Sequence, residues 1–293
     1  MRIIRAQFLG MCFGVRDAIA LAVEHADAGP LTIIGDLVHN PVVLEGLRNK
    51  GIAVAHDLEE VRTPTVMITA HGTSERALAA TRALGLTVVE ATCPLVRVAH
   101  RAVAALVRDG YHPVIIGQRN HVEVRGLTDD LDAFDVVLDD DDVAMLDPRP
   151  RIGVAAQTTQ SIENVRHLVG LIRRQFPQSD VRFIDSVCRP TKDRQNAARD
   201  LARQSDVVIV VGGANSNNTR ELARACRLFC SRVHQVQASS DLSPEWFRGA
   251  DTVGVTAGTS TPDDVIGRVE QRIRELAALS HEERTTCTVE GNR

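Results

Sequence analysis

Short apolar runs rich in β-branched residues alternate with helix-length segments along this whole chain, and this alternation is the feature that most limits its possible folds. It is typical of parallel sheets whose strands are joined by helical crossovers. We predict nine strands, namely Arg2–Ala6, Leu31–Gly35, Thr65–Thr69, Thr87–Glu90, Pro113–Gly117, Arg151–Ala155, Val181–Asp185, Asp206–Val211 and Asp251–Thr256. The pattern therefore predicts an α/β fold with mainly parallel sheets.

Two different features recur along the chain with almost the same pair of intervals. Polar loops after three glycine-ended strands contain a histidine or serine at steps of 82 and 95 residues: His39, His121 and Ser216. Cysteines that follow other strands recur at steps of 81 and 95 residues: Cys12, Cys93 and Cys188. This agreement predicts three similar α/β lobes.

We expect the lobes to span residues 13–94, 95–188 and 189–280, with the strand in residues 1–12 completing the third and residues 281–293 forming a tail. The carboxyl ends of parallel strands carry the chemistry in such folds, because loops and helix N-termini meet there. We therefore predict a pseudo-threefold axis and a central cavity that the three cysteines face.

Composition and charge exclude several classes of protein. The formal net charge is −4 and only nine residues are aromatic, which argues against a nucleic-acid-binding surface. No apolar run approaches the roughly 18–20 residues of a membrane span, and the N-terminus lacks a signal-peptide pattern. We expect a soluble, cytoplasmic protein without a membrane or nucleic-acid partner.

The remaining cysteines fall outside the repeat. Cys226 and Cys230 are four residues apart in the predicted helix Arg220–Phe229, so we expect both in the core. Cys287 lies in the polar tail. The acidic run 139–142 is better explained as a helix N-terminus or a solvated loop than as a magnesium site.

Three thiolates in one cavity require a cation, since their charges repel one another. An iron–sulfur cluster accepts ligands from three distant loops, and four irons held by three cysteines leave one iron open. Zinc is a second possibility, although structural zinc sites usually use local Cys-x₂₋₄-Cys pairs, which this chain lacks. A site without metal is the third.

Polar side chains at the strand ends indicate a phosphate or diphosphate site that lacks a lysine or arginine clamp. They are His39, His71, Ser216, Asn218 and Ser260, with the Gly258-Thr259 backbone. Taken singly, each serine or asparagine would be better explained as a helix cap or turn former, and the alternative for each histidine is an ordinary hydrogen-bonded side chain.

Glu123 lies two residues after His121 on the same loop. A carboxyl group near a cluster and a diphosphate would have a raised pKa and become a proton donor. The alternative is a solvated loop acid. Thr158 and Thr159 are candidates to relay that proton or to hold a substrate hydroxyl.

Several segments in order along the chain resemble the 4-hydroxy-3-methylbut-2-enyl diphosphate reductase family, which completes the methylerythritol phosphate route to isoprenoids. The segments are Cys12–Val15, Val38–Asn40, Ala70–Gly72, Ala91–Val96, His121–Val124, Gln157–Thr159, Arg194–Gln195, Asn215–Ser216 and Val255–Gly258 with Ser260 and Pro262. The resemblance covers nearly the whole chain.

The resemblance implies a reductive dehydroxylation by two electrons that yields isopentenyl and dimethylallyl diphosphate. Cys12, Cys93 and Cys188 resemble the ligands of a [4Fe-4S] cluster. The resemblance implies that ferredoxin or flavodoxin donates the electrons, that Glu123 is the proton source and that Thr158 contacts the substrate hydroxyl. The implied contacts of the allylic diphosphate are His39, His71, His121, Ser216, Asn217, Asn218 and Ser260.

The chain departs from the family pattern at Met11, Val122, Arg125, Asn217, Arg189 and Pro190. Asn217 replaces a usual serine but keeps hydrogen-bonding groups. Arg125 and Arg189 add charge near the expected cavity, which bears on the choice of substrate. Two further hypotheses are a divergent paralogue that serves as a redox or metabolite sensor, and a zinc or metal-free hydrolase or isomerase acting on a phosphorylated metabolite.

Overall fold

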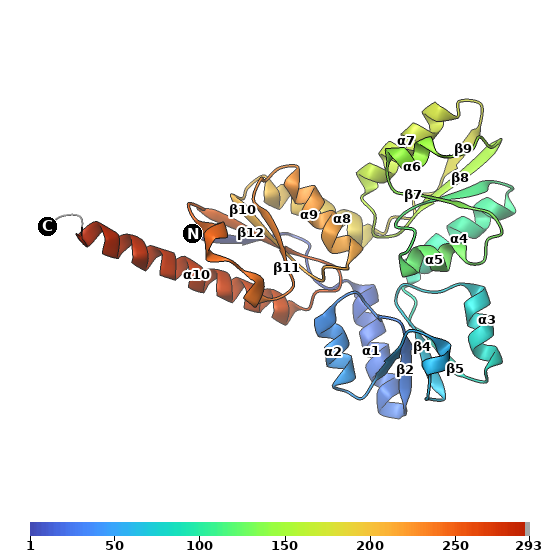
Figure 1. Cartoon of the computed structure of the whole chain (residues 1–293), viewed down its shortest axis with the longest axis horizontal. Helices are drawn as coiled ribbons and strands as arrows, with labels where there is room; N and C mark the ends of the chain where they lie inside the picture. The colour runs from blue at the N-terminus through green and yellow to red at the C-terminus, as the bar shows by residue number, and fades with distance from the viewer. Residues whose placement is uncertain (291–293) are drawn as a thin grey trace. The chain divides into compact units, whose positions relative to one another are not determined.

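The structure is a computed structural model that describes residues 1–290, with side chains up to residue 278, so Cys287 lies outside the described side chains. It contains three four-stranded parallel sheets, each the centre of one lobe (Figure 1). Lobes 1 and 2 form one compact unit, Phe13–Lys192. Lobe 3 forms the other, from Met1–Cys12 and the chain after Lys192.

Lobe 1 has the strand order β3-β2-β4-β5. Its elements are α1 (Phe13–Ala28), β2 (Leu31–Ile34), α2 (Pro41–Arg48), β3 (Ala53–Ala55), a 3₁₀ turn (Leu58–Glu60), β4 (Thr65–Ile68), α3 (Glu75–Ala83) and β5 (Thr87–Glu90). Helix α2 begins where Asn40 Oδ1 accepts the Val42 and Val43 N–H groups, followed by a proline at the first helical position. The strand-end polar residue therefore starts the next helix.

Lobe 2 repeats this order as β7-β6-β8-β9. Its elements are α4 (Pro94–Arg108), β6 (His112–Ile116), α5 (Val122–Thr128), β7 (Asp135–Val137), α6 (Asp140–Ala144), β8 (Arg151–Ala156), α7 (Ile162–Gln175) and β9 (Asp180–Phe183). Asp139 caps α6 by accepting the Asp142 N–H at 3.0 Å. The acidic run 139–142 is thus a helix N-terminus, as predicted.

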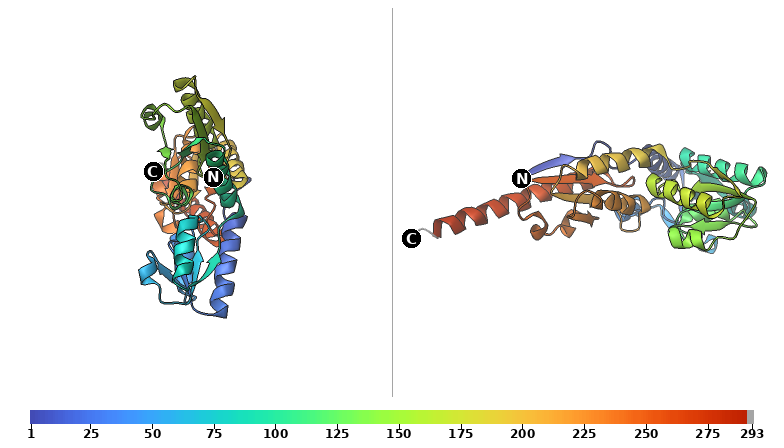
Figure 2. Two further views of the ribbon diagram at one scale, coloured as in Figure 1. Left: turned by 90° about the vertical axis from the view of Figure 1, so that its right-hand side faces the viewer. Right: turned by 90° about the horizontal axis from the view of Figure 1, so that it is seen from above.

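Lobe 3 completes its sheet with the N-terminal strand, and its order is β11-β10-β12-β1. Its elements are β1 (Arg2–Arg5), α8 (Arg189–Ala202), β10 (Val207–Val211), α9 (Asn217–Arg227), β11 (Val233–Val236), 3₁₀ turns (Ser239–Asp241, Pro244–Phe247), β12 (Thr252–Ala257) and α10 (Asp263–Glu290). Strand β1 pairs with β12 from Arg2 opposite Thr252 to Arg5 opposite Val255. Helix α10 runs well past this sheet (Figure 2) and includes residues 281–290 of the expected tail.

All nine predicted strands are present, with ends within two residues of those expected. The three strands that the sequence did not indicate are β3, β7 and β11. Each has only three or four residues and lies at the same edge of its sheet, beside β2, β6 or β10. A strand paired on one side needs less apolar patterning, so its sequence signal is weak. The shared order confirms three similar lobes.

Cys226 and Cys230 are core residues, as predicted. Cys226 is fully buried, its thiol faces the Ala198 carbonyl, and burial raises its pKa to about 12. Cys230 lies three residues beyond the end of α9 instead of inside the helix, with its thiol near the Asp206 carbonyl. The environment of Cys226 does not favour the thiolate that a metal requires.

Candidate active site

The loops after β2, β6 and β10 are held by the same backbone hydrogen bond. The glycine that follows the strand donates its N–H to the last carbonyl of the edge strand, with Gly35 to Ala55 at 2.7 Å, Gly117 to Val137 at 2.9 Å and Gly212 to Val236 at 2.8 Å. The fourth residue after each glycine is His39, His121 or Ser216. These three side chains therefore occupy equivalent places, which explains their intervals in the sequence.

The three cysteines are equivalent by the same test. Each cysteine donates its backbone N–H to the carbonyl of the second residue after a neighbouring strand. Cys12 bonds Thr259, Cys93 bonds Ala70 and Cys188 bonds Thr158, all at 3.0 Å. Those strands are β12, β4 and β8. Each cysteine thus lies beside one of the polar turns singled out in the sequence. The common axis and central cavity of the lobes stay a prediction.

Each of these cysteines directly precedes a helix, namely α1, α4 or α8. The Cys93 Sγ lies so close to the first turn of α1 that a Cβ on Gly14 would be 2.5 Å from it. The Cys188 Sγ lies 3.1 Å from the Thr191 hydroxyl. Helix N-termini favour the thiolate form of a cysteine, and these three cysteines form no disulfide among the described residues and are partly exposed. This chemistry suits soft metal ligation.

A buried arginine, Arg194, holds the loop before Cys12 in place. Arg194 is 8% exposed and donates from Nε and Nη2 to the Gly10 carbonyl at 3.1 and 2.8 Å. The carbonyl of Gly10, two residues before Cys12, thus accepts two charge-assisted hydrogen bonds. Its contact partner is 184 residues away in the sequence, so no local pattern indicates this role.

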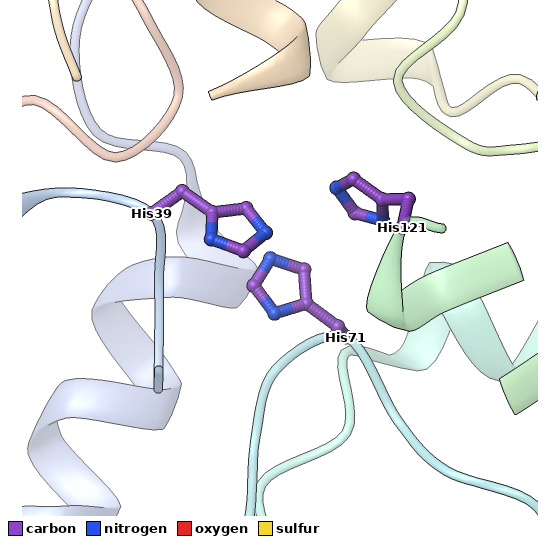
Figure 3. Close-up of side chains that lie close together, drawn as sticks. All are labelled: His39, His71 and His121. Atoms are coloured by element: carbon purple, nitrogen blue, oxygen red, sulfur yellow. The ribbon is translucent and has the colours of Figure 1, made fainter. Parts of the chain in front are cut away.

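Three imidazoles from the loops after β2, β4 and β6 meet in the first unit (Figure 3). His39 stacks on His71 with ring centroids 4.4 Å apart. His121 stands edge-on to both, at 5.0 Å from His39 and 5.5 Å from His71. We call these three residues the histidine triad. The structure therefore brings together all three histidines that the sequence proposed for the site.

Within the histidine triad, His71 is held mainly in its neutral form. Burial, followed by repulsion from His39 and His121, holds the pKa of His71 well below its usual range. The His71 Nδ1 atom is buried without a hydrogen-bond partner among the residues that the structure describes. A buried polar atom without a partner carries a free-energy cost, so a ligand that satisfies it would bind favourably.

A hydrogen bond at His121 determines which kind of ligand fits. His121 is the N-cap of α5, and its Nδ1 accepts the Glu123 N–H at 3.1 Å. In the neutral ring the proton is therefore on Nε2, which is a donor. The nitrogens of the triad lie close enough together for a metal ion, but a metal needs a nitrogen without a proton. The arrangement favours an anion over a metal.

Glu123 and Thr158 are joined by two hydrogen bonds inside lobe 2. Glu123 is 1% exposed, its Oε1 accepts the Thr158 N–H at 2.6 Å, and its Oε2 is 3.0 Å from the Thr158 hydroxyl. Burial raises the pKa of Glu123 to about 7, against a lowering by the Thr158 hydrogen bonds. The raised pKa agrees with the direction predicted from the sequence, and in the chain itself desolvation of the side chain causes it. Such a carboxyl group can donate a proton near neutral pH.

Lobe 3 presents a second set of buried polar side chains at the start of α9. Ser216 caps this helix by accepting the Thr219 N–H at 3.4 Å, so the simple cap explanation also holds. Asn217 and Asn218 are 2% exposed and Ser260 is 4% exposed. Neither the amide oxygen nor the amide nitrogen of Asn218 has a partner within residues 1–278. This amide is available to a ligand.

Two glycines allow the first turn of α9 to approach the strand ends closely. A Cβ on Gly258 would lie 2.3 Å from the Thr219 Oγ1, and one on Gly212 would lie 2.5 Å from it. Gly212 also has a φ of +154°. Larger residues would push α9 away from β10 and β12, so these glycines set the position of Ser216 and Asn218.

A profile of the LytB protein family matches residues 3–274. The chain belongs to this family. The chain is 38% identical over 278 residues to 4-hydroxy-3-methylbut-2-enyl diphosphate reductase of Pelobacter propionicus, covering 94% of this chain and 99% of the relative. The reductase of Aquifex aeolicus is also 38% identical, covering 94% and 96%.

A solved structure of the E-1-hydroxy-2-methyl-but-2-enyl-4-diphosphate reductase from Plasmodium falciparum has a TM-score of 0.86 at 26% identity, with 92% of this chain and 87% of that chain covered. The LytB match runs through all three lobes, from β1 into α10. The resemblance drawn from the motifs is thus confirmed, as is the expectation of an oxidoreductase of isoprenoid biosynthesis. Within the described residues, no helix combines the length and apolar character needed to cross a membrane.

Proposed function

We propose that this LytB-family chain reduces 4-hydroxy-3-methylbut-2-enyl diphosphate to isopentenyl and dimethylallyl diphosphate. The reaction breaks the carbon–oxygen bond of the alcohol, consumes two electrons and two protons, and releases water. The observation that carries the proposal is the buried Glu123, with a pKa of about 7, held by Thr158. The Thr158 carbonyl in turn accepts the Cys188 N–H, so a proton donor lies beside a candidate metal ligand.

Cys12, Cys93 and Cys188 would hold a [4Fe-4S] cluster. Their equivalent positions, the absence of a disulfide at any of them in the described chain and their places before helix N-termini support this ligand set. It requires that the three lobes bring the cysteines to a common axis. When bound, the cluster supplies electrons that it receives from an external ferredoxin or flavodoxin, and an open iron for the substrate alcohol.

The side chains that we propose as diphosphate ligands are uncharged donors and acceptors. In the first unit, the histidine triad offers the Nε2–H of His121 and the unsatisfied Nδ1 of His71. A bound diphosphate would raise the lowered pKa of His71 and so favour its charged form beside the ligand. In lobe 3, the residues proposed to bind are Ser216, Asn217, Asn218 and Ser260. Their burial favours tight hydrogen bonds to phosphate oxygens.

The Glu123–Thr158 pair would act at the other end of the substrate. We assign the Thr158 hydroxyl to the substrate alcohol, because a protonated Glu123 can donate to the Thr158 oxygen and leave the one hydroxyl proton of Thr158 for the substrate. Glu123 supplies the proton that turns the leaving hydroxide into water. Glu123 must be protonated for this step, so its pKa of about 7 keeps a large fraction of the enzyme competent at neutral pH.

The test begins with iron and sulfide analysis of protein purified without oxygen, followed by dithionite-driven turnover of the hydroxylated diphosphate. About four irons and four sulfides per chain with product formation support the proposal. Stoichiometric zinc without iron would instead favour a hydrolase or isomerase. Cluster-loaded protein that binds inorganic diphosphate but does not consume the substrate would favour a sensor. A crystal structure with Cys12, Cys93 and Cys188 far apart would overturn the cluster.

A further inference from the structure

A residue of lobe 2 caps a helix of lobe 1. The Asp130 carboxylate accepts the N–H of Glu75 at 2.7 Å and that of Arg76 at 2.9 Å, the first two residues of α3. The N-cap Ser74 accepts the Ala77 N–H at 3.1 Å. Three of the four N–H groups that a helix start leaves without a partner are thus satisfied, two of them from the other lobe.

Helix α5 touches the same segment a second time. A Cβ on Gly126 would lie 3.3 Å from the Thr73 Cα, with the Thr73 carbonyl carbon and nitrogen at 3.5 and 3.6 Å. All three are backbone atoms, so no side-chain rotation could relieve a larger residue. Gly126 is buried, and α5 therefore lies directly against the backbone two residues after His71.

These two contacts join two members of the histidine triad. Helix α5 begins at its N-cap His121, and Asp130 follows directly after its C-cap Asp129. The segment it contacts, Thr73 to Arg76, begins two residues after His71. A helix of this length is a rigid element, so a shift of α5 against the segment would move His121 relative to His71.

We infer that Asp130 and Gly126 are positioning residues that set the spacing of His71 and His121, and through it the affinity for the diphosphate. The inference rests on the proposed function, because it uses the triad as the diphosphate site. Neither residue touches the triad rings in the described contacts, which is why the effect must act through the backbone of α5 and of the segment after His71.

The test compares cluster-loaded Asp130→Ala and Gly126→Ala with the wild type. In Asp130→Ala we expect the Kd for inorganic diphosphate and the KM for substrate to rise about five- to tenfold, the change that corresponds to losing a helix-capping interaction. Gly126→Ala should raise both in the same direction, because its added Cβ would push α5 and the Thr73 backbone apart. We expect kcat to fall by a smaller factor, because Glu123 and Thr158 both belong to lobe 2 whereas His71 belongs to lobe 1. Asp130→Asn retains an acceptor oxygen and should lie between Asp130→Ala and the wild type.

Asp139→Ala is the matched control. Asp139 caps α6 in the same lobe, and its loss removes a comparable hydrogen bond from a helix that carries no site residue. We expect it to lower the melting temperature about as much as Asp130→Ala does, with KM and Kd unchanged. A fall in melting temperature alone in both variants would reduce Asp130 to an ordinary cap and overturn the inference.

A ligand-independent measurement separates this inference from the proposed function. In histidine-labelled protein, nuclear Overhauser contacts between the ring protons of His71 and His121 report their spacing directly, since the centroids are 5.5 Å apart. We expect these contacts to weaken in Asp130→Ala and Gly126→Ala and to persist in Asp139→Ala. If the wild type fails to bind diphosphate, the proposed function fails while this result still decides the role of Asp130. Unchanged contacts would overturn it.

Discussion

The polar turns after β4 and β8 share one backbone arrangement but offer different chemistry. In lobe 1, the Ala70 carbonyl accepts the Cys93 N–H and the next residue is His71, whose Nδ1 finds no partner in the described part of the chain. In lobe 2, the Thr158 carbonyl accepts the Cys188 N–H, whereas the N–H and the hydroxyl of Thr158 both bond Glu123. An unsatisfied polar atom suits ligand recognition, whereas a satisfied pair suits proton storage.

Burial moves the pKa values of His71 and of Glu123, the partner of Thr158, in opposite directions, but the result is the same for both. It lowers the pKa of His71 well below its usual range and raises that of Glu123 to about 7. Both shifts favour the neutral form. A diphosphate with several negative charges therefore meets a mainly neutral Glu123 below pH 7.

The largest effect should separate the repeated cysteines from the core ones. Cys93→Ser removes the thiol that lies against the first turn of α1, so we expect nearly complete loss of iron. Cys226→Ala removes a buried thiol from the core of lobe 3, so we expect iron content to be unchanged. Iron and sulfide analysis of anaerobically purified protein measures both. Equal loss in the two variants would contradict the equivalence of the three lobes.

The next largest effect should be on kcat, and it tests Glu123 and Thr158 of lobe 2 as the source of the proton. Glu123→Gln keeps the size of the side chain but cannot donate a proton, so we expect kcat to fall about 10²- to 10⁴-fold with diphosphate affinity retained. In the wild type, kcat should fall as the pH rises above about 7, because the ionised carboxylate cannot act as the acid. Steady-state rates from pH 6 to 9 measure this, and Glu163→Gln on the exposed face of α7 is the control. A flat profile would remove Glu123 from the proton step.

The unsatisfied side chains should show a smaller effect, on affinity rather than rate. His71→Ala and Asn218→Ala each remove buried donors or acceptors available to a charged ligand, so we expect the Kd for diphosphate to rise about ten- to a hundredfold. Calorimetric titration with inorganic diphosphate measures it. Asn164→Ala on α7, whose amide already bonds the Leu138 carbonyl, should leave the Kd unchanged. If all three variants bind equally well, the diphosphate lies elsewhere.

The repeat was predictable because equivalent residues of the three lobes are separated by matching numbers of residues in the sequence. His39, His121 and Ser216 stand four residues after equivalent glycines, so matching intervals translate directly into matching positions. The convergence of His39 with His71 and His121 followed from the rule that strand ends carry the site. Their ring geometry did not, because it depends on how two lobes pack together.

Other features had no sequence signal that could have revealed them. Asp130 contacts residues 54 and 55 positions away, and Arg194 contacts one 184 positions away, so neither belongs to a periodic pattern. The edge strand Ala53–Ala55 is too short for alternation to be visible. The raised pKa of Glu123 was predicted from charges expected near it, whereas the structure attributes it to burial, which a loop position does not suggest.

The smallest effect is a change in stability with pH that separates burial from charge at Glu123. Its pKa is about 7 in the folded chain and about 4.5 when exposed, so the folded state holds a proton that the unfolded state has lost. Stability therefore falls as the pH rises through 7, by about 1.4 kcal/mol between pH 6 and pH 8 for this one group. Glu123→Gln does not titrate and lacks this slope. Urea unfolding of both proteins at the two pH values gives the difference, in which the other groups cancel. If the wild type and the variant lose stability equally, Glu123 is not buried in the way that sets lobe 2 apart from lobe 1.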